Sequence, residues 1–238
     1  MAGTIKTSFK YASNELEALA EAKNYYQWIV AHFARYIGKR VVEVGAGIGN
    51  FSDFLLQSNA LSQLILVEPA ENLVPQLQER FSKDDRVEVI HGYLESLDES
   101  LLVDSVILVN VLEHVEDDLG ALRRIREILP PEGRLLLFVP ALPFLFNSLD
   151  DSFEHVRRYT KPLLGARLRE TGYRIEVLRY LNLPGVCSWF LTGKILRAKT
   201  LRPWPVRIYD RWFIPWVSRL ERYWEPPVGS SLIAVVKK

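Results

Sequence analysis

The sequence predicts an α/β protein built on a doubly wound, mostly parallel seven-stranded sheet, with a helical insertion before the last strand. Strand and helix patterns alternate after Gly38, which is the order that right-handed β-α-β crossovers require. The strand segments are nearly continuous runs of valine, isoleucine and leucine, as in strands covered by helices on both faces. We expect strands at 40–44, 63–68, 86–90, 104–110, 133–140, 173–181 and 230–237.

The helices are predicted from apolar residues spaced three or four apart. One amphipathic helix is expected over 14–37, capped by Ser13 or Asn14. The helix around Pro75 requires this proline to lie in its first turn. Further helices are expected at 51–57, at 71–81, at 117–129 with Asp117 or Asp118 as cap, and at 161–172 with Thr160 as cap.

The chain is interpreted as one domain, 1–238, with an N-terminal helical cover at 1–37. A single cysteine, Cys187, excludes an intrachain disulfide, and the first residues lack the apolar core of a signal peptide. The longest apolar stretch, 135–146, is too short to span a bilayer. We therefore expect a cytoplasmic protein. Thirty basic and 29 acidic residues give no overall electrostatic footprint for nucleic acid, so no nucleic-acid partner is expected.

Residues 183–226 differ from the rest in composition. They carry eight basic and three acidic residues, a net charge of +5, while the remaining chain sums to −4. Five tryptophans are interleaved with the arginines. This helical insertion is expected to be a lid over the substrate, a homodimer contact, or a peripheral contact with an anionic membrane.

A glycine-rich turn follows the first expected strand, in the segment VVEVGAGIGNFS. Gly45, Gly47 and Gly49 are spaced G-x-G-x-G, and Asn50 stands where a dinucleotide fingerprint has its third glycine. The Gly-Lys-Ser/Thr ending of a P-loop is also missing. Glu43, two residues before the first glycine, would repel a pyrophosphate and attract a cation. The turn therefore favours S-adenosylmethionine, which carries an ammonium and a sulfonium.

The second expected strand ends in Glu68, followed by Pro69. A carboxylate at this position of a doubly wound sheet is placed to accept hydrogen bonds from both ribose hydroxyls of a nucleoside lying across the strand ends. The alternative is a glycine turn that only packs helix to strand, with Glu68 as a solvated strand end. The turn, the acid and the order of the strands together favour the nucleoside.

Four motifs in order resemble class I S-adenosylmethionine-dependent methyltransferases over roughly residues 38–182: VVEVGAGIGNFS, LILVEPAENL, VILVNVLEHVEDD and LPPEGRLLLFVP. The resemblance implies that the turn lines the methionine part of the cofactor, that Glu68 binds the ribose and that Asn110 borders the sulfonium. Where family members often have Gly-Asp, this chain has HGYLESL, so the adenine contact stays open between Tyr93, the Leu94 amide and Glu95. The predicted cofactor-binding residues are Glu43, Gly45, Ala46, Gly47, Gly49, Glu68, Pro69, Tyr93, Leu94 and Asn110.

The segment LDDSFEHVRRYTKPLL follows the fifth expected strand, so its residues should lie over the carboxyl ends of the strands, where open α/β sheets bind ligands. His155 is the predicted general base, oriented by Asp150 or Asp151. The two arginines after it offer forked donors for a carboxylate or phosphate on the acceptor. The alternative is a surface charge run before a helix. The predicted substrate-binding residues are Arg157, Arg158 and Tyr159.

His114 lies just after the fourth expected strand, in LEHVED, and is the second candidate catalytic residue. It either positions the acceptor or caps the next helix. Methyl transfer is an in-line displacement, so catalysis is mostly alignment, and a base is needed only if the acceptor loses a proton. We expect no metal ligand.

The predicted function is methyl transfer from S-adenosylmethionine to a small-molecule or lipid-linked acceptor, at a hydroxyl oxygen. EHVRRYT also resembles a D-x-x-x-H-x-R-R-Y-T signature of bacterial methyltransferases in glycan and lipid-linked sugar pathways. The alternatives are a non-catalytic S-adenosylmethionine-binding scaffold or sensor, and an RNA or protein methyltransferase. Against the nucleic-acid alternative, the chain lacks the Asn/Asp-Pro-Pro-aromatic motif of amino-group methylators.

Overall fold

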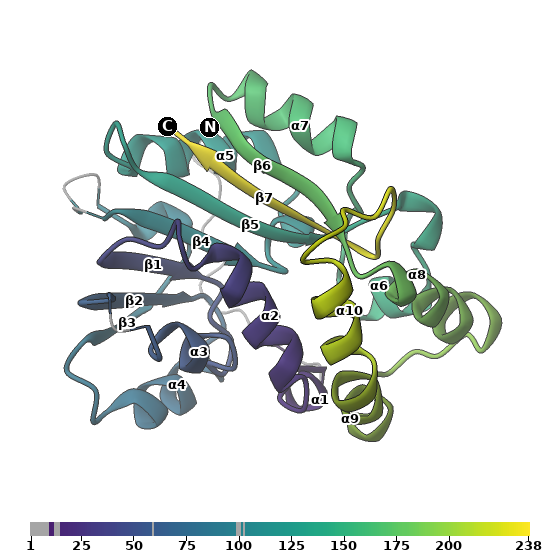
Figure 1. The fold of residues 1–238 in the computed structure, drawn as a ribbon. Helices are drawn as coiled ribbons and strands as arrows, with labels where there is room; N and C mark the ends of the chain where they lie inside the picture. Colours follow the sequence, from purple (N-terminus) through teal and green to yellow (C-terminus); the bar gives the residue numbers. More distant parts are fainter. Residues whose placement is uncertain (1–9, 12–14, 59, 99–100, 102) are drawn as a thin grey trace.

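The computed structural model describes residues 10, 11, 15–58, 60–98, 101 and 103–238. Its centre is a seven-stranded sheet in the order β3-β2-β1-β4-β5-β7-β6 (Figure 1). Each predicted strand is present to within one residue at either end. The strands are β1 (Arg40–Val44), β2 (Gln63–Glu68), β3 (Val87–His91), β4 (Ser105–Val109), β5 (Arg134–Pro140), β6 (Arg174–Leu181) and β7 (Ser231–Lys237).

The first five strands are parallel, and β7 inserts antiparallel between β5 and β6. The strand order reverses between β1 and β4, because β2 and β3 extend one way from β1 and β5 extends the other way from β4. The carboxyl ends of β1 and β4 therefore border the crevice where doubly wound sheets bind ligands. The predicted fold class is confirmed.

Helices cover both faces of the sheet (Figure 1). Leucine and isoleucine side chains of α5 and α7 pack on one face, and α2, α3, α4 and α10 pack on the other. Alternate residues of β1 point to opposite faces, with Val42 in one core and Val41 in the other. The helices are α1 (Glu15–Leu19), α2 (Lys23–Phe33), α3 (Ser52–Leu55), α4 (Val74–Phe81), α5 (Asp118–Ile128), α6 (Ser148–Ser152), α7 (Lys161–Glu170), α8 (Leu183–Trp189), α9 (Pro203–Trp212) and α10 (Ile214–Leu220).

Three local predictions hold. Pro75 lies in the first turn of α4. The Asp117 carboxylate caps α5 by accepting the amide of Gly120, and the Thr160 hydroxyl caps α7 by accepting the amide of Leu163.

The single helix predicted over 14–37 is wrong, because the chain forms α1 and α2 with a break at Ala20–Ala22. The proposed caps Ser13 and Asn14 lie outside the described residues. The break has a tertiary cause. The carboxylate of Asp210, on α9, accepts the backbone amides of Asn24 at 3.0 Å and Tyr25 at 2.8 Å. In one continuous helix these amides would bond to carbonyls four residues earlier, so the helix must restart here.

Asp210→Ala is expected to lower the free energy of unfolding by about 1–3 kcal/mol, because two amides at the start of α2 lose their acceptor in a buried place. Urea denaturation at pH 7 measures this difference. Asp85→Ala is the matched control, since Asp85 is exposed. A loss no larger than that of the control would contradict the role of Asp210 in holding α9 against α2.

Candidate active site

The glycine turn between β1 and α3 has a backbone that other residues adopt only with strain. Gly45 has φ +73° and Gly49 has φ +83°. A Cβ on Gly45 would lie 2.5 Å from Cγ2 of Val111, and one on Gly49 would lie 2.5 Å from Cε2 of Phe81. Both glycines are therefore required, by conformation and by close packing.

The Glu68 carboxylate at the end of β2 ties the turn to the next strand. It accepts the amide of Gly47 at 2.7 Å on Oε2 and the amide of Ala70 at 2.8 Å on Oε1. Burial raises the pKa of Glu68, and these two hydrogen bonds oppose the rise. Each carboxylate oxygen still has a lone pair for a ligand hydroxyl. Glu68 thus shapes the turn, and its predicted ribose contact stays a prediction.

Glu43 is the feature that fits a cationic cofactor. Its carboxylate is buried on the wall of the cavity, where it accepts the hydroxyl of Ser52 at 2.7 Å. Burial, together with the charge of Glu68, raises the pKa of Glu43 to about 8. A cation placed beside it would favour the ionised carboxylate. The residues present therefore fit S-adenosylmethionine better than an anionic nucleotide.

S-adenosylmethionine binding is expected to release protons from Glu43 near pH 7. The pKa of about 8 leaves this carboxyl mostly protonated at neutral pH, and a bound cation lowers that pKa, so affinity rises as the pH rises from 6 to about 7.5, below the pH at which the ligand's ammonium loses its proton. Calorimetry in two buffers with different ionisation enthalpies counts the protons. Glu43→Gln should reduce the release. The ligand's own ammonium titrates near pH 8, but it is common to both proteins and cancels in the comparison. Equal proton release by the two proteins would contradict the assignment.

A cavity of about 1140 Å³ lies at the carboxyl ends of the strands. This volume is somewhat above the roughly 300–1,000 Å³ usual for small-molecule sites, which leaves room for a cofactor and an acceptor. Gly49 does not line it, and neither do Arg157 and Tyr159. The predicted site residues that do line it are Glu43, Gly45, Ala46, Gly47, Glu68, Pro69, Tyr93, Leu94, Asn110, His114, His155 and Arg158.

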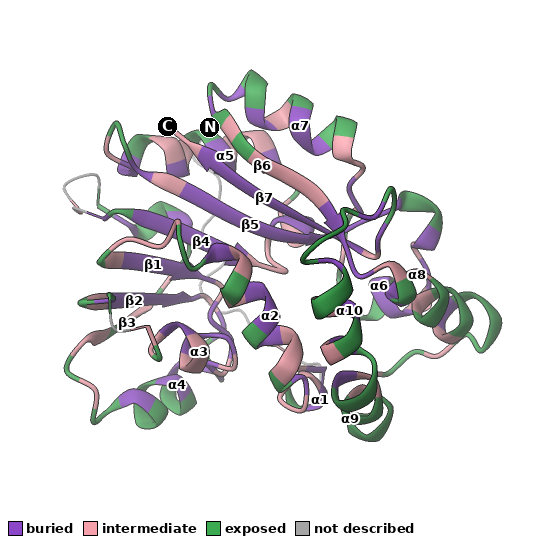
Figure 2. Cartoon of the chain, in the orientation of Figure 1, coloured by how far each residue is buried: buried purple, intermediate pink, exposed green. Residues whose placement is uncertain are grey.

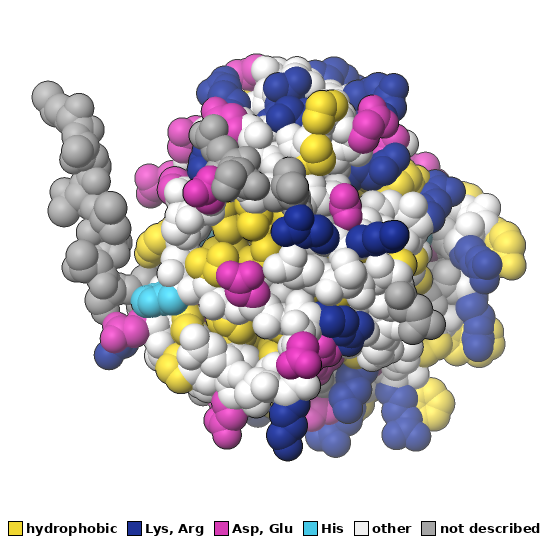
Figure 3. All heavy atoms as spheres, turned by 90° about the vertical axis from the view of Figure 1, so that its left-hand side faces the viewer, with side chains coloured by type: hydrophobic (Ala, Val, Ile, Leu, Met, Phe, Trp, Pro, Cys, Tyr) yellow, Lys and Arg dark blue, Asp and Glu magenta, His cyan; other side chains and the backbone are white. Residues whose placement is uncertain are grey.

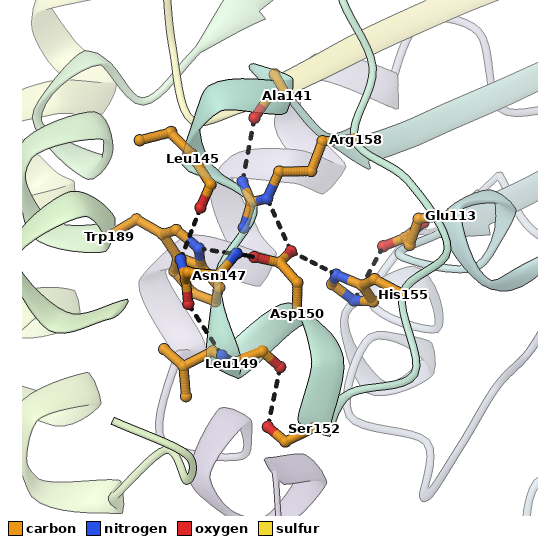
Figure 4. Close-up of polar contacts among 10 residues, drawn as sticks. All are labelled: Glu113, Ala141, Leu145, Asn147, Leu149, Asp150, Ser152, His155, Arg158 and Trp189. Carbon is orange, nitrogen blue, oxygen red and sulfur yellow. Dashed lines mark hydrogen bonds and ion pairs between the residues drawn. The ribbon is translucent and has the colours of Figure 1, made fainter. Parts of the chain in front are cut away.

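His155 lines the cavity. Figure 4 shows its ring held by the carboxylate of Asp150. Its Nδ1 lies 2.8 Å from Oδ1 of Asp150. The same Oδ1 accepts Nε of Arg158 at 2.7 Å. Burial opposes ionisation of Asp150, but the hydrogen bond from His155 and the charge of Arg158 outweigh it and lower the pKa of Asp150. The ionised carboxylate fixes the proton of His155 on Nδ1, so Nε2 carries the lone pair.

The other oxygen of Asp150 is held as firmly as the first. Oδ2 accepts the backbone amide of Asn147 at 3.0 Å and Nε1 of Trp189, from α8, at 3.3 Å. The Arg158 guanidinium in turn donates to the carbonyl oxygen of Ala141 at 3.1 Å. Asp150 therefore cannot turn away from His155 without breaking several buried hydrogen bonds.

Glu113 and His114 complete this cluster on the short helical turn η2 (Leu112–His114). Oε1 of Glu113 lies 3.9 Å from Nε2 of His155, and the rings of His114 and His155 meet edge to face at 4.8 Å. Burial raises the pKa of Glu113 to about 8. Burial, with the nearby His155, lowers the pKa of His114 to about 4, so His114 is neutral at pH 7. His114 thus lines the site and does not cap α5, a role that Asp117 fills.

Arg157 and Tyr159 do not take the places predicted for them. The guanidinium of Arg157 pairs with Asp118 at 2.8 Å, and the Tyr159 hydroxyl donates to the same carboxylate at 3.0 Å. Tyr159 is fully buried. Both side chains are therefore bound to Asp118 away from the cavity, and neither is placed to bind the acceptor. Arg158 does line the cavity, but its buried guanidinium serves Asp150.

Sequence reasoning left Asp150 and Asp151 open and passed over Glu113. The structure brings Asp150 to His155, whereas Asp151 is exposed. Glu113 precedes the candidate histidine His114 directly in the sequence, and this neighbouring position was the signal that could have identified it as a site residue. No metal ligand was predicted. Even so, Glu113, His114 and His155 each offer a ligand atom within 4.8 Å of one another, close enough to share a cation.

A doubly wound sheet with a glycine turn after β1, an acid ending β2 and a cavity across both defines a nucleoside-cofactor enzyme of the class I methyltransferase type. Comparison with known proteins agrees with this class. The chain belongs to the methyltransferase-domain family, which matches residues 15–179. The chain therefore contains a methyltransferase domain, and the geometry of its glycine turn, Glu43 and Glu68 fits S-adenosylmethionine as the methyl donor.

One curated relative is the mitochondrial ubiquinone biosynthesis O-methyltransferase of Schizosaccharomyces pombe. It is 29% identical over 128 residues, which are 52% of this chain and 46% of the relative, so the match spans less than half of that protein. Two solved structures share the fold. A methyltransferase in complex with the Trm112 activator of Haloferax volcanii is 16% identical with a TM-score of 0.62, and an S-adenosylmethionine-dependent methyltransferase of Thermotoga maritima is 19% identical with a TM-score of 0.61. Each alignment covers 94% of this chain and 95% of the other.

Proposed function

We propose that this enzyme methylates a hydroxyl oxygen of a small-molecule or lipid-linked acceptor, with His155 as the general base. One observation carries the proposal. The hydrogen-bonded pair of His155 and Asp150 lies on the wall of the same cavity as the glycine turn and Glu43. Acceptors that attack as neutral amines need no such base, whereas a hydroxyl must lose its proton. The Schizosaccharomyces pombe relative is named as an O-methyltransferase, which supports the same class of acceptor.

The residues that would hold the cofactor are Glu43, the glycine turn and Glu68, and the cofactor would supply an electrophilic methyl group on its sulfonium. Nε2 of His155 then takes the proton of the acceptor hydroxyl. The resulting imidazolium is stabilised by the ionised Asp150 at Nδ1, and Glu113 lies 3.9 Å from Nε2 on its other side. His114, neutral at pH 7, adds no charge to repel the imidazolium.

The acceptor's own charge is suggested by two basic residues on the cavity wall. Lys199 and Arg202, from the insertion, line the cavity. These two side chains, and not Arg157, would bind an anionic group of the acceptor, such as the phosphate of a lipid-linked sugar. An acceptor of this kind would place its phosphate near the insertion and its hydroxyl near His155.

Transfer of a labelled methyl group tests the proposal. The purified enzyme is incubated with labelled S-adenosylmethionine and with aqueous or lipid-extractable fractions of cells. Label that survives mild alkali as an ether supports a hydroxyl acceptor, whereas an alkali-labile ester or a methylamine would contradict it. Cofactor binding with no transfer to any fraction would instead favour a scaffold or sensor.

A divalent cation is the alternative way to activate the same hydroxyl, because Glu113, His114 and His155 lie close enough to share one. The labelled assay therefore has an EDTA arm. If His155 acts as a base, EDTA leaves turnover unchanged. Loss of turnover that Mg²⁺ or Zn²⁺ restores would assign the activation to the cation.

A further inference from the structure

Residues 190–224 form an unusually apolar surface, which we call the aromatic basic surface. Of seventeen exposed large hydrophobic side chains among the described residues, twelve lie in this segment. Their helices α9 and α10, with the turn after α8, are mostly exposed in Figure 2. The twelve are Phe190, Leu191, Ile195, Leu196, Trp204, Ile208, Trp212, Phe213, Trp216, Leu220, Tyr223 and Trp224.

Every exposed charge on this surface is positive. The segment holds two acids, Asp210 and Glu221, and both are buried. Asp210 holds the start of α2, and Glu221 accepts the amides of Asn182 at 2.9 Å and Leu183 at 3.0 Å at the start of α8. Both carboxylates therefore face inward, where they accept hydrogen bonds from backbone amides at the starts of helices. The eight bases are exposed: Lys194, Arg197, Lys199, Arg202, Arg207, Arg211, Arg219 and Arg222.

The apolar residues line up along the helices. Trp204, Ile208 and Trp212 follow one another at intervals of four on α9, so they share one face. Trp216 and Leu220 repeat this spacing on α10. Basic side chains stand alongside, as at Arg211, whose guanidinium lies 6.0 Å from the ring centre of Trp212. On the side of the molecule in Figure 3, by contrast, basic and acidic side chains are interspersed.

We propose that the aromatic basic surface docks on an anionic lipid bilayer. Tryptophan and aliphatic side chains flanked by lysine and arginine are the composition that enters the headgroup region of such a membrane. A homodimer through this surface would bring eight positive charges against eight, since a two-fold interface pairs each patch with itself. Aliphatic side chains such as Leu196 and Ile208 offer bases no stacking partner, which disfavours nucleic acid. No helix of the described chain is long and apolar enough to cross the bilayer, so the contact is peripheral.

The surface also joins the cavity. Leu196 and Arg202 belong to the aromatic basic surface and line the cavity as well. An acceptor anchored in the bilayer would thus meet the cavity at the membrane surface. This consequence rests on the proposed function, whereas bilayer docking does not.

Co-sedimentation with vesicles tests the docking. Wild-type protein should bind phosphatidylcholine vesicles containing 30% phosphatidylglycerol, and binding should weaken at least tenfold in 0.5 M NaCl. Arg219→Gln/Arg222→Gln should weaken it about 10- to 30-fold, and Trp216→Ala about 5- to 10-fold. The matched controls are Arg123→Gln/Arg169→Gln and Leu163→Ala, all on α5 and α7, which should bind within twofold of wild type. Thermal unfolding confirms that each variant is folded.

Equal binding to neutral and anionic vesicles, or no effect of the aromatic basic variants, would overturn the proposal. So would a dimer that Trp216→Ala converts to monomer in light scattering, or tighter binding to a single-stranded RNA that the same variants abolish. The variant His155→Ala separates the two proposals. It should bind vesicles as wild type does while transferring the methyl group about 10²- to 10⁴-fold more slowly. Vesicle binding by the wild-type protein with no methyl transfer would refute only the proposed function, and methyl transfer without vesicle binding would refute only the membrane surface.

Discussion

His155→Ala is expected to lower kcat about 10²- to 10⁴-fold, which is the usual contribution of a positioned general base. The reason is geometric. Nδ1 is fixed by Asp150, so the lone pair lies on Nε2 of a side chain that lines the cavity, and Nε2 is the atom proposed to take the acceptor's proton. The rate of label transfer at saturating S-adenosylmethionine measures the loss, and calorimetry of the cofactor should show little change in its affinity.

Asp150 and Asp151 provide a matched pair of variants for the same prediction. Asp150→Asn should lower kcat by a factor of ten or more. The neutral asparagine side chain cannot stabilise the imidazolium of His155 as a carboxylate does, and Arg158 loses its anionic partner. Asp151→Asn should leave kcat unchanged, since that side chain is exposed. If both variants retain full turnover, or if His155→Ala does, the base assignment is wrong.

Glu68→Ala is expected to weaken the binding of S-adenosylmethionine about 10- to 100-fold. A hydrogen bond to a charged group is worth about 1.5–3 kcal/mol, and the ribose would lose its acceptor. In addition, the amides of Gly47 and Ala70 lose the carboxylate that shapes the glycine turn. Isothermal calorimetry gives the dissociation constant.

Two further variants interpret that result. Glu79→Ala removes an exposed acid from α4 and should bind the cofactor as wild type does. Glu68→Asp keeps the charge on a shorter side chain and should fall between wild type and Glu68→Ala. Unchanged affinity in Glu68→Ala would count against both the ribose contact and the role of Glu68 in the turn.

The fold was predictable from local pattern because the central strands, such as β4 and β5, are nearly continuous apolar runs that alternate with helical patterns. The glycine turn was predictable for the same reason, since Gly45 and Gly49 have backbone angles that few other residues adopt without strain. The family comparison agrees with the cofactor that Glu43 and the glycine spacing indicated.

The partners of side chains were less predictable. Arg157 and Arg158 are adjacent and were given one role, but neighbouring residues in an extended segment point in opposite directions. One pairs with Asp118 and the other with Asp150. The choice between Asp150 and Asp151 has the same cause, because consecutive positions on α6 face different sides, and only one faces His155.

The sequence by itself determined the sheet, the methyl donor and the excess of positive charge in the insertion, because each depends on the order or content of nearby residues. Only the tertiary structure decided that α1 and α2 are separate, that Asp210 and Glu221 face inward, and that the exposed charge of residues 190–224 is wholly positive. These outcomes depend on amides supplied by α2 and α8, distant in sequence from the acids that accept them. The position of a buried carboxylate depends on the backbone amides that donate hydrogen bonds to it, and no local sequence pattern specifies which amides these are.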